Sequence, residues 1–109
     1  MNIYNKSSLI DFYKKHKFAR LPLEIWYEEV ESKEWKNPNQ LKNEYRANIS
    51  ILRNGRVVFN IKGNDYRLIA AINFENSWVF IKFIGTHVEY DKIDANTIDL
   101  YKPKKRSIK

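Results

Sequence analysis

One short stretch of the sequence concentrates side chains suited to acid–base and charge chemistry: His87, Tyr90, Asp91 and Lys92. An unperturbed imidazole titrates at a pH of about 6.5, so His87 can serve as a general acid or base near neutrality. Tyr90 can donate a proton or stack on a base, and a lysine can stabilise charge that develops on a phosphate. A structural alternative, in which His87 caps a turn and Tyr90 packs on the core, is also open.

A second group of polar residues is spread over the strands that precede this stretch. Asn60 and Lys62 are two residues apart and therefore share a face of an extended strand. Arg67 opens the next strand across a turn, and Lys82 lies on the last strand. With regular registers, all four side chains gather on the face of the sheet that is turned away from the helices. Such a basic patch on a rigid sheet suits phosphate binding, although an ordinary solvent-facing surface with lysines would show the same pattern.

Other kinds of catalytic site find no support in the sequence. There is no Cys, which excludes disulfides, thiolate zinc sites and cysteine nucleophiles. The two His residues have no metal-binding spacing, and we interpret His16 as a structural or surface residue. Three Gly residues cannot build a phosphate-binding loop, and no Ser lies at a strained, Gly-flanked turn. The sequence therefore predicts neither a metal site nor a cofactor.

The positive charge of the chain is concentrated at its C-terminal end. The 109 residues carry a formal net charge of +7, and residues 102–109 alone hold five cations and no anion. We interpret residues 1–101 as one domain and residues 102–109 as a basic tail, so a polyanion must be recognised by local clustering of cations. The longest apolar run, Leu68–Ile72, is far shorter than the roughly 20 residues of a membrane helix. With no signal-like stretch and no Cys, we expect a cytoplasmic protein without a membrane partner.

The N-terminal part of the sequence shows the helical spacing of apolar residues that would support these sites. Ser7 or Ser8 is expected to cap a first helix that continues to His16. Leu21-Pro22 marks the start of a second helix, because proline suits the first helical turn. Asn37-Pro38 can open a short third helix. The apolar stripe of the second helix consists of Leu23, Trp26, Tyr27 and Val30.

After about residue 47 the pattern becomes extended. Asn54-Gly55 is the strongest hairpin signal, since both residues tolerate a positive φ, and further turns are expected at 63–65 and 75–77. The expected strands span residues 49–53, 56–62, 66–74 and 78–84, with a short edge strand at residues 2–5. We therefore expect an α+β fold in which two N-terminal helices pack on one face of a twisted antiparallel sheet.

Alternation along the last two strands predicts which side chains meet the helices. In the first of them, one face carries Tyr66, Leu68, Ala70, Ile72 and Phe74. Ile69 and Ala71 share the opposite face with Arg67, and we expect them to lie beneath the C-terminal segment or a partner. In the last strand, one face is expected to carry Val79, Ile81 and Phe83, and the other Phe80, Lys82 and Ile84.

Two motifs, VVFNIKGNDYRL at residues 57–68 and FIGTHVEYDK at residues 83–92, resemble the HigB toxin family. These proteins are RelE-like mRNA interferases of type II toxin–antitoxin systems. The resemblance extends from about Ile3 to Ile98 and leaves out the basic tail. It implies a small RelE-like fold, endonucleolytic cleavage of messenger RNA, often on the ribosome, and a HigA-type helix-turn-helix antitoxin as partner.

The resemblance also implies a site on the open sheet face and its C-terminal border. For this sequence we expect catalytic roles for Arg67, His87, Lys62 and Tyr90. We expect Lys82, Asn60 and Lys92 to bind substrate. RNA cleavage without a metal uses the substrate's own 2′-hydroxyl as nucleophile, so the protein supplies proton transfer and charge stabilisation. DNA lacks this hydroxyl and should not be cut.

Two other classes of function are open from the sequence alone. A ParE-like toxin on a similar fold would poison DNA gyrase and leave messages intact. A simple RNA-binding module, using the aromatic residues and the basic tail, would bind RNA in a salt-sensitive way and release no product.

Overall fold

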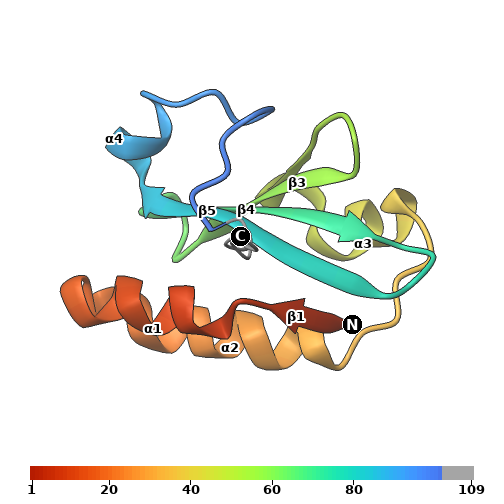
Figure 1. Cartoon of the computed structure of the whole chain (residues 1–109), viewed down its shortest axis with the longest axis horizontal. Coiled ribbons are helices and arrows are strands. Elements are labelled where there is room, and N and C mark those ends of the chain that lie inside the picture. Colours follow the sequence, from red (N-terminus) through yellow and green to blue (C-terminus); the bar gives the residue numbers. More distant parts are fainter. Residues whose placement is uncertain (102–109) are drawn as a thin grey trace, which may run out of the picture.

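The molecule consists of a five-stranded sheet and a pair of long helices that covers one of its faces (Figure 1). The computed structural model describes residues 1–101. Its elements are β1 (Asn2–Tyr4), α1 (Lys6–Lys15), α2 (Arg20–Glu31), α3 (Pro38–Tyr45), β2 (Ile49–Ile51), β3 (Arg56–Ile61), β4 (Tyr66–Asn73), β5 (Trp78–Thr86) and α4 (His87–Tyr90). Short 3₁₀ turns precede α2 and β2. This is the α+β architecture expected from the sequence.

The sheet has the strand order β1-β5-β4-β3-β2. Strands β2 to β5 form the expected antiparallel meander, and β1 joins its edge in parallel with β5. Asn54 and Gly55 turn the β2–β3 hairpin with φ of 58° and 75°, as their residue types predict. Only Gly fits at position 55, because a Cβ there would lie 2.9 Å from the carbonyl oxygen of Ile72 in β4.

The helices begin close to the expected positions, with one correction. The prediction that Ser7 or Ser8 caps the first helix is wrong, because α1 already begins at Lys6. Ser8 is buried, and its hydroxyl donates to the carbonyl oxygen of Asn5 at 2.7 Å. At α3 the expected cap is present, since the side-chain oxygen of Asn37 accepts the N–H of Gln40 at 3.1 Å.

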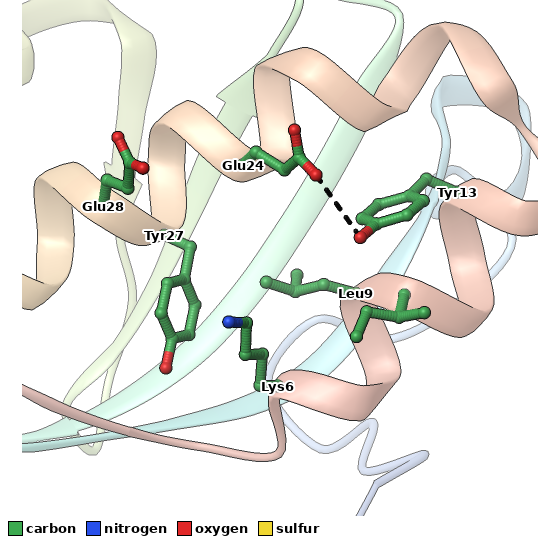
Figure 2. Close-up of a pocket in the computed structure, with 7 residues that line it drawn as sticks. Lys6, Leu9, Tyr13, Glu24, Tyr27 and Glu28 are labelled. Carbon is green, nitrogen blue, oxygen red and sulfur yellow. Dashed lines mark hydrogen bonds between the residues drawn. The ribbon is translucent and has the colours of Figure 1, made fainter.

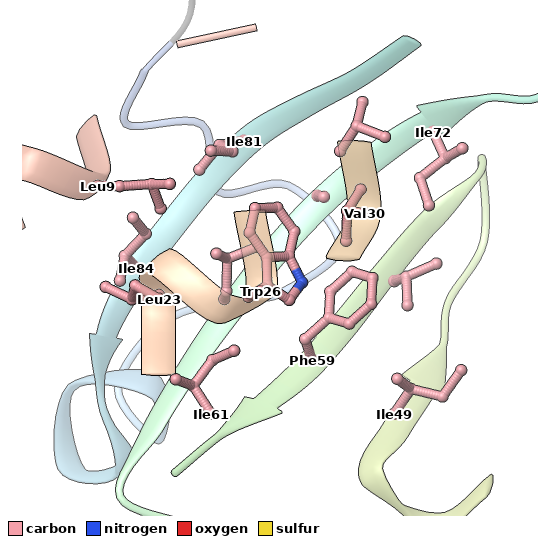
Figure 3. Packing of buried hydrophobic residues seen from close by; sticks show 14 of the residues in the cluster. Leu9, Leu23, Trp26, Val30, Ile49, Phe59, Ile61, Ile72, Ile81 and Ile84 are labelled. Carbon is pink, nitrogen blue, oxygen red and sulfur yellow. The ribbon is translucent and has the colours of Figure 1, made fainter. Parts of the chain in front are cut away.

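The main hydrophobic core lies between the α1–α2 pair and the inner face of the sheet (Figure 3). Phe59 of β3 is 1% exposed, and the rings of Trp26 and Tyr45 meet it edge-on, each at a centroid distance of 5.4 Å. The indole N–H of Trp26 is buried and has no hydrogen-bond acceptor within residues 1–101. Figure 3 shows the indole nitrogen on the side of Trp26 that faces the Phe59 ring. The side chains of β4 that were predicted to face the helices lie in this core or pack against it.

A β-bulge in β5 corrects the predicted alternation of the last strand. Ile69 pairs with Phe83 and the next residue, Ala70, pairs with Ile81, so Lys82 is an extra residue without a ladder partner in β4. Residues after the bulge therefore face the opposite way from the simple two-residue period. Phe83 joins a second cluster on the outer face, and Ile84 lies in the main core.

The outer face of the sheet is crossed by residues 91–101, which we call the C-terminal strap. Ile93, Ala95 and Ile98 of the strap pack on the outer cluster, which is formed by Val58, Ile69 and Phe83. The guanidinium of Arg56 donates to the carbonyl oxygens of Ala95 at 3.0 Å and Ile98 at 2.8 Å. The strap thus covers Ile69, as the sequence led us to expect for this apolar residue on the outer face.

We expect the substitution Arg56→Ala to loosen the strap, because it leaves two strap carbonyl groups without their charged donor. The free energy of unfolding should fall by about 1–3 kcal/mol in a urea titration. The Arg53→Ala variant is the matched control, since Arg53 is exposed in the same hairpin and should leave stability nearly unchanged. Equal stability of the two variants would contradict an anchoring role for Arg56.

Candidate active site

Arg67 is held at the end of the sheet where β3, β4 and α4 meet. Its Cα lies opposite Asn60 of β3 and Gly85 of β5. One terminal nitrogen, Nη1, donates to the carbonyl oxygens of Asn64 at 3.0 Å and Tyr66 at 3.4 Å. Within residues 1–101 the structure gives no acceptor for Nε or Nη2. Arg67 is therefore fixed by its own turn and keeps a pair of N–H donors for a bidentate phosphate contact.

The short helix α4 follows β5 directly and presents the acid–base residues. Its start is fixed by a capping box, in which the Thr86 hydroxyl accepts the N–H of Glu89 and the Glu89 carboxylate accepts the N–H of Thr86. The backbone N–H of His87 also donates to the carbonyl oxygen of Asp65, at 3.0 Å. This bond from His87 to Asp65 ties α4 to the β3–β4 turn beside Arg67.

Tyr90 connects this helix to Arg67. Its ring packs on Phe83 at a centroid distance of 6.5 Å, and the guanidinium carbon of Arg67 lies 5.5 Å from the ring centre. Gly85 makes this arrangement possible, because a Cβ at position 85 would collide with the Phe83 ring at 2.4 Å. Tyr90 is half-buried on the outer cluster, so the structural role considered for it is present beside its contact with Arg67.

His87 is half-exposed at the first position of α4, and Thr86, not His87, is the residue that caps the turn. Its Nε2 lies 3.8 Å from a carboxylate oxygen of Asp91, one helical turn further on. Asp91 can thus orient the imidazole. His87 and Tyr90 are three residues apart on the helix and so occupy neighbouring positions on its surface.

Lys62 does not lie on a strand, which corrects the prediction that it continues the face of Asn60. β3 ends at Ile61, and Lys62 sits in the following turn with φ of 53°. Its ammonium is exposed and forms an ion pair with Asp65 at 2.8 Å. The hydrogen bond and then the charge of Asp65 raise the pKa of Lys62, which therefore stays charged at neutral pH.

The structure does not bring Lys82 to this group of residues. The outer cluster with Phe83 and Ile69 lies between it and Arg67 along the sheet. Its ammonium forms an ion pair with Asp99 of the strap at 3.2 Å, and both side chains are at least three-quarters buried. Lys92 is exposed just after α4, and Asn60 stands opposite Arg67. The candidate site thus comprises Asn60, Lys62, Arg67, His87, Tyr90 and Lys92.

Three contributions to this site were missed from the sequence. The first is the capping box of α4, which the Thr86-x-x-Glu89 spacing would have revealed. The second is Asp91, identified in the sequence but not as the partner of His87, although four-residue spacing suggests it once a helix is expected. The third is Arg56, whose contacts lie 39 and 42 residues along the chain and leave no local signal.

Residues 1–101 contain no group of three His, Asp or Glu side chains placed to hold a metal ion. In the same part of the chain, no helix is both long and apolar enough to cross a membrane.

The fold is that of a class of small RelE-like toxins. Residues 19–93 fit the HigB toxin family, described as the RelE-like toxic component of a toxin–antitoxin system. This match covers more than half of the chain, and the chain belongs to this family. As the toxin of such a system, it has an antitoxin as its partner.

The chain is also similar to individual proteins that are named HigB. The chain is 30% identical to the mRNA interferase HigB of Escherichia coli O6:H1 (strain CFT073), over 85% of this chain and 91% of the relative. It is 28% identical to the mRNA interferase toxin HigB of Escherichia coli K12, over 87% of this chain and 92% of the relative. The mRNA interferase HigB of Shigella flexneri is equally similar.

Proposed function

We propose that this chain is a metal-independent endoribonuclease that cleaves messenger RNA, and that it acts on message under translation by the ribosome. The family and the names of the relatives support this activity. One observation in this molecule carries the proposal: at one end of the sheet a guanidinium packs on a phenol ring, and an imidazole lies three residues before that ring on the same short helix. Arg67 lies 5.5 Å from the Tyr90 ring, and His87 is the first residue of the same four-residue helix.

The proposed reaction needs no group from outside the RNA as nucleophile. The 2′-hydroxyl oxygen forms a bond to the adjacent phosphorus while the bond from phosphorus to the 5′ oxygen breaks. The 2′-hydroxyl loses its proton and the leaving 5′ oxygen gains one. The products are a 2′,3′-cyclic phosphate and a 5′-hydroxyl. The protein has to transfer protons and to stabilise the extra negative charge on the phosphate, which are the two abilities of this site.

Each residue of the site receives one task in this proposal. Arg67 binds the scissile phosphate through Nε and Nη2, and Lys62 adds positive charge beside it. His87 transfers protons, and Asp91 orients its imidazole. Tyr90 orients a base by stacking. We further assign Asn60 and Lys92 to the flanking nucleotides. Lys82, which the sequence suggested for this task, is left out because the outer cluster with Ile69 and Phe83 lies between it and Arg67.

We expect a single 2′-deoxynucleotide at the scissile position to abolish cleavage of an otherwise unmodified RNA, because the nucleophile is then missing. Cleavage of the unmodified RNA should continue in EDTA and yield a cyclic phosphate end, which mass spectrometry detects. A deoxynucleotide one position downstream is the matched control and should be tolerated. Cleavage of the substituted RNA, or loss of cleavage in EDTA, would contradict the mechanism. Growth arrest with intact transcripts would favour a gyrase poison instead.

The finer features of the partnership are also part of this proposal. We assign the antitoxin to the HigA type, a helix-turn-helix protein that neutralises the toxin. Comparison of message cleavage with and without ribosomes tests ribosome dependence, and equal rates would contradict it.

A further inference from the structure

Three exposed apolar side chains lie together on α2 and on the 3₁₀ turn that precedes it. Phe18, Leu21 and Ile25 are 72%, 65% and 54% exposed, and their spacing of three and four residues places them in one row. We call these three residues the α2 stripe. Val88 and Leu100 are similarly exposed but lie singly elsewhere. A contiguous apolar row on a small water-facing surface is typical of a docking site for another macromolecule.

The α2 stripe borders an open groove of about 340 Å³ between α2 and the end of β3. Leu21 and Ile25 form one wall, Tyr45 lies in the groove, and Asn60 and Lys62 form the wall on the side of the candidate active site. The Tyr45 hydroxyl donates to Glu29 at 2.7 Å. Burial and this bond raise the pKa of Tyr45 well above its ordinary value, so the polar group in the groove stays neutral.

The charges around the stripe select the sign of the partner. Lys14, Lys15 and Lys17 precede the stripe and are exposed, and no carboxylate forms an ion pair with them within residues 1–101. Of the acidic residues at the stripe, Glu24 is engaged by Arg20 at 3.2 Å and Glu29 accepts the Tyr45 hydroxyl, while Glu28 is exposed at the end of the stripe away from the lysines. An apolar ridge beside a groove, with free cations at one end, is complementary to an amphipathic helix that carries carboxylates at one end.

We propose that the α2 stripe and its groove bind the antitoxin through an acidic, amphipathic segment. The inference rests on membership of a toxin–antitoxin family, and it adds the surface and the chemistry of the contact. An occupant of this groove lies against Asn60 and Lys62, which border the candidate site. Binding there would obstruct RNA at this border and so neutralise the toxin without contact with His87.

Two other surfaces were weighed against the α2 stripe. The hollow between α1 and α2, of about 350 Å³, is occupied by internal contacts (Figure 2). Tyr13 donates to Glu24 at 3.5 Å, and the Lys6 ammonium lies 4.7 Å from the centre of the Tyr27 ring. Tyr4 and Trp78, at the β1–β5 edge, are only 39% and 38% exposed, and Trp78 stacks on Phe80. This edge serves as the rival surface in the test.

The test uses the full chain and the product of the adjacent open reading frame, chosen because it neutralises toxicity on co-expression. We expect Ile25→Asp to weaken binding by at least about 30-fold in a calorimetric titration, because it places a charge in the centre of the stripe. Leu100→Asp is the matched control at an isolated exposed residue and should bind normally. Changing Lys14, Lys15 and Lys17 together to Glu should slow association, most strongly at low salt.

The possible results separate this inference from the proposed function. Retained RNA cleavage by Ile25→Asp, without neutralisation by the antitoxin, supports the surface. Unchanged affinity of Ile25→Asp overturns it, and loss of affinity in Trp78→Asp alone moves the contact to the β1–β5 edge. If Ile25→Asp loses ribosome-dependent cleavage but still binds the antitoxin, the inference is overturned, and the α2 stripe is an RNA contact instead. Binding is measured without RNA, so the result stands even if the proposed nuclease chemistry fails.

Discussion

Replacement of Arg67 by Ala is expected to slow RNA cleavage by about 10²- to 10³-fold, the usual effect of losing one preorganised donor to developing charge. Arg67 is the residue of the site whose position is most strongly determined, since it is held by the turn carbonyl of Asn64 and by the Tyr90 ring. Its Nε and Nη2, which have no acceptor within residues 1–101, form a planar pair of donors that the single charge of the Lys62 ammonium cannot replace. Single-turnover cleavage of a defined message on ribosomes measures the effect.

Two variants make the Arg67 result interpretable. Arg67→Lys keeps the charge but loses the planar pair of donors, so we expect an intermediate rate. Arg53→Ala removes an exposed arginine of the β2–β3 hairpin and should cleave at the rate of the unchanged protein. Undiminished cleavage by Arg67→Ala would remove this residue from the site. If Arg67→Ala also loses its thermal unfolding transition, its slow cleavage reflects a folding defect instead. The cleavage rate of Arg67→Lys then decides whether Arg67 belongs to the site.

The substitution Phe59→Ala is expected to lower the free energy of unfolding by about 3–5 kcal/mol, which is a large share of the stability of a domain of this size. The Phe59 ring joins Trp26 of α2, Tyr45 of α3 and the inner face of the sheet. Its removal leaves a cavity where three elements meet, and the aromatic neighbours cannot close it without leaving their edge-on geometry. Urea denaturation followed by tryptophan fluorescence measures this loss.

The matched control removes the same side chain from an exposed position. Phe18 is 72% exposed, so Phe18→Ala should change stability by no more than about 0.5 kcal/mol. Similar losses in both variants would mean that Phe59 is not the centre of the core.

The layer of helices and the layer of strands each follow from local patterns of residues, which is why both can be predicted from the sequence. The helical row of Leu23, Trp26 and Val30 and the alternation along β4 each require one buried face, and packing the helix on the sheet buries both. Asn54-Gly55 and Asn37-Pro38 act within a few residues, so their turn and cap can be read directly from the residue types.

The candidate site was predicted less completely, because it depends on a single irregularity and on distant contacts. The bulge at Lys82 reverses the alternation of β5, exchanging the faces expected for Phe83 and Ile84. Simple alternation contains no information about such an extra residue. Arg67, His87 and Tyr90 were identified by their chemistry and by resemblance. Lys82 is separated from them because the Ile69–Phe83 pair lies between it and Arg67 along the sheet, and its ammonium pairs with Asp99 of the strap, 17 residues away.

The strap also affects the order in which parts of the chain can fold during synthesis. Arg56 secures carbonyl groups 39 and 42 residues later, so one side of the sheet can be closed only after nearly all of the described chain has been synthesised. Contacts of such long sequence separation form slowly, since a large loop must first be closed. In a nascent toxin, Ile69 and its neighbours therefore stay exposed to water until residues 91–101 have been synthesised, and Tyr90, which packs there, is ordered late.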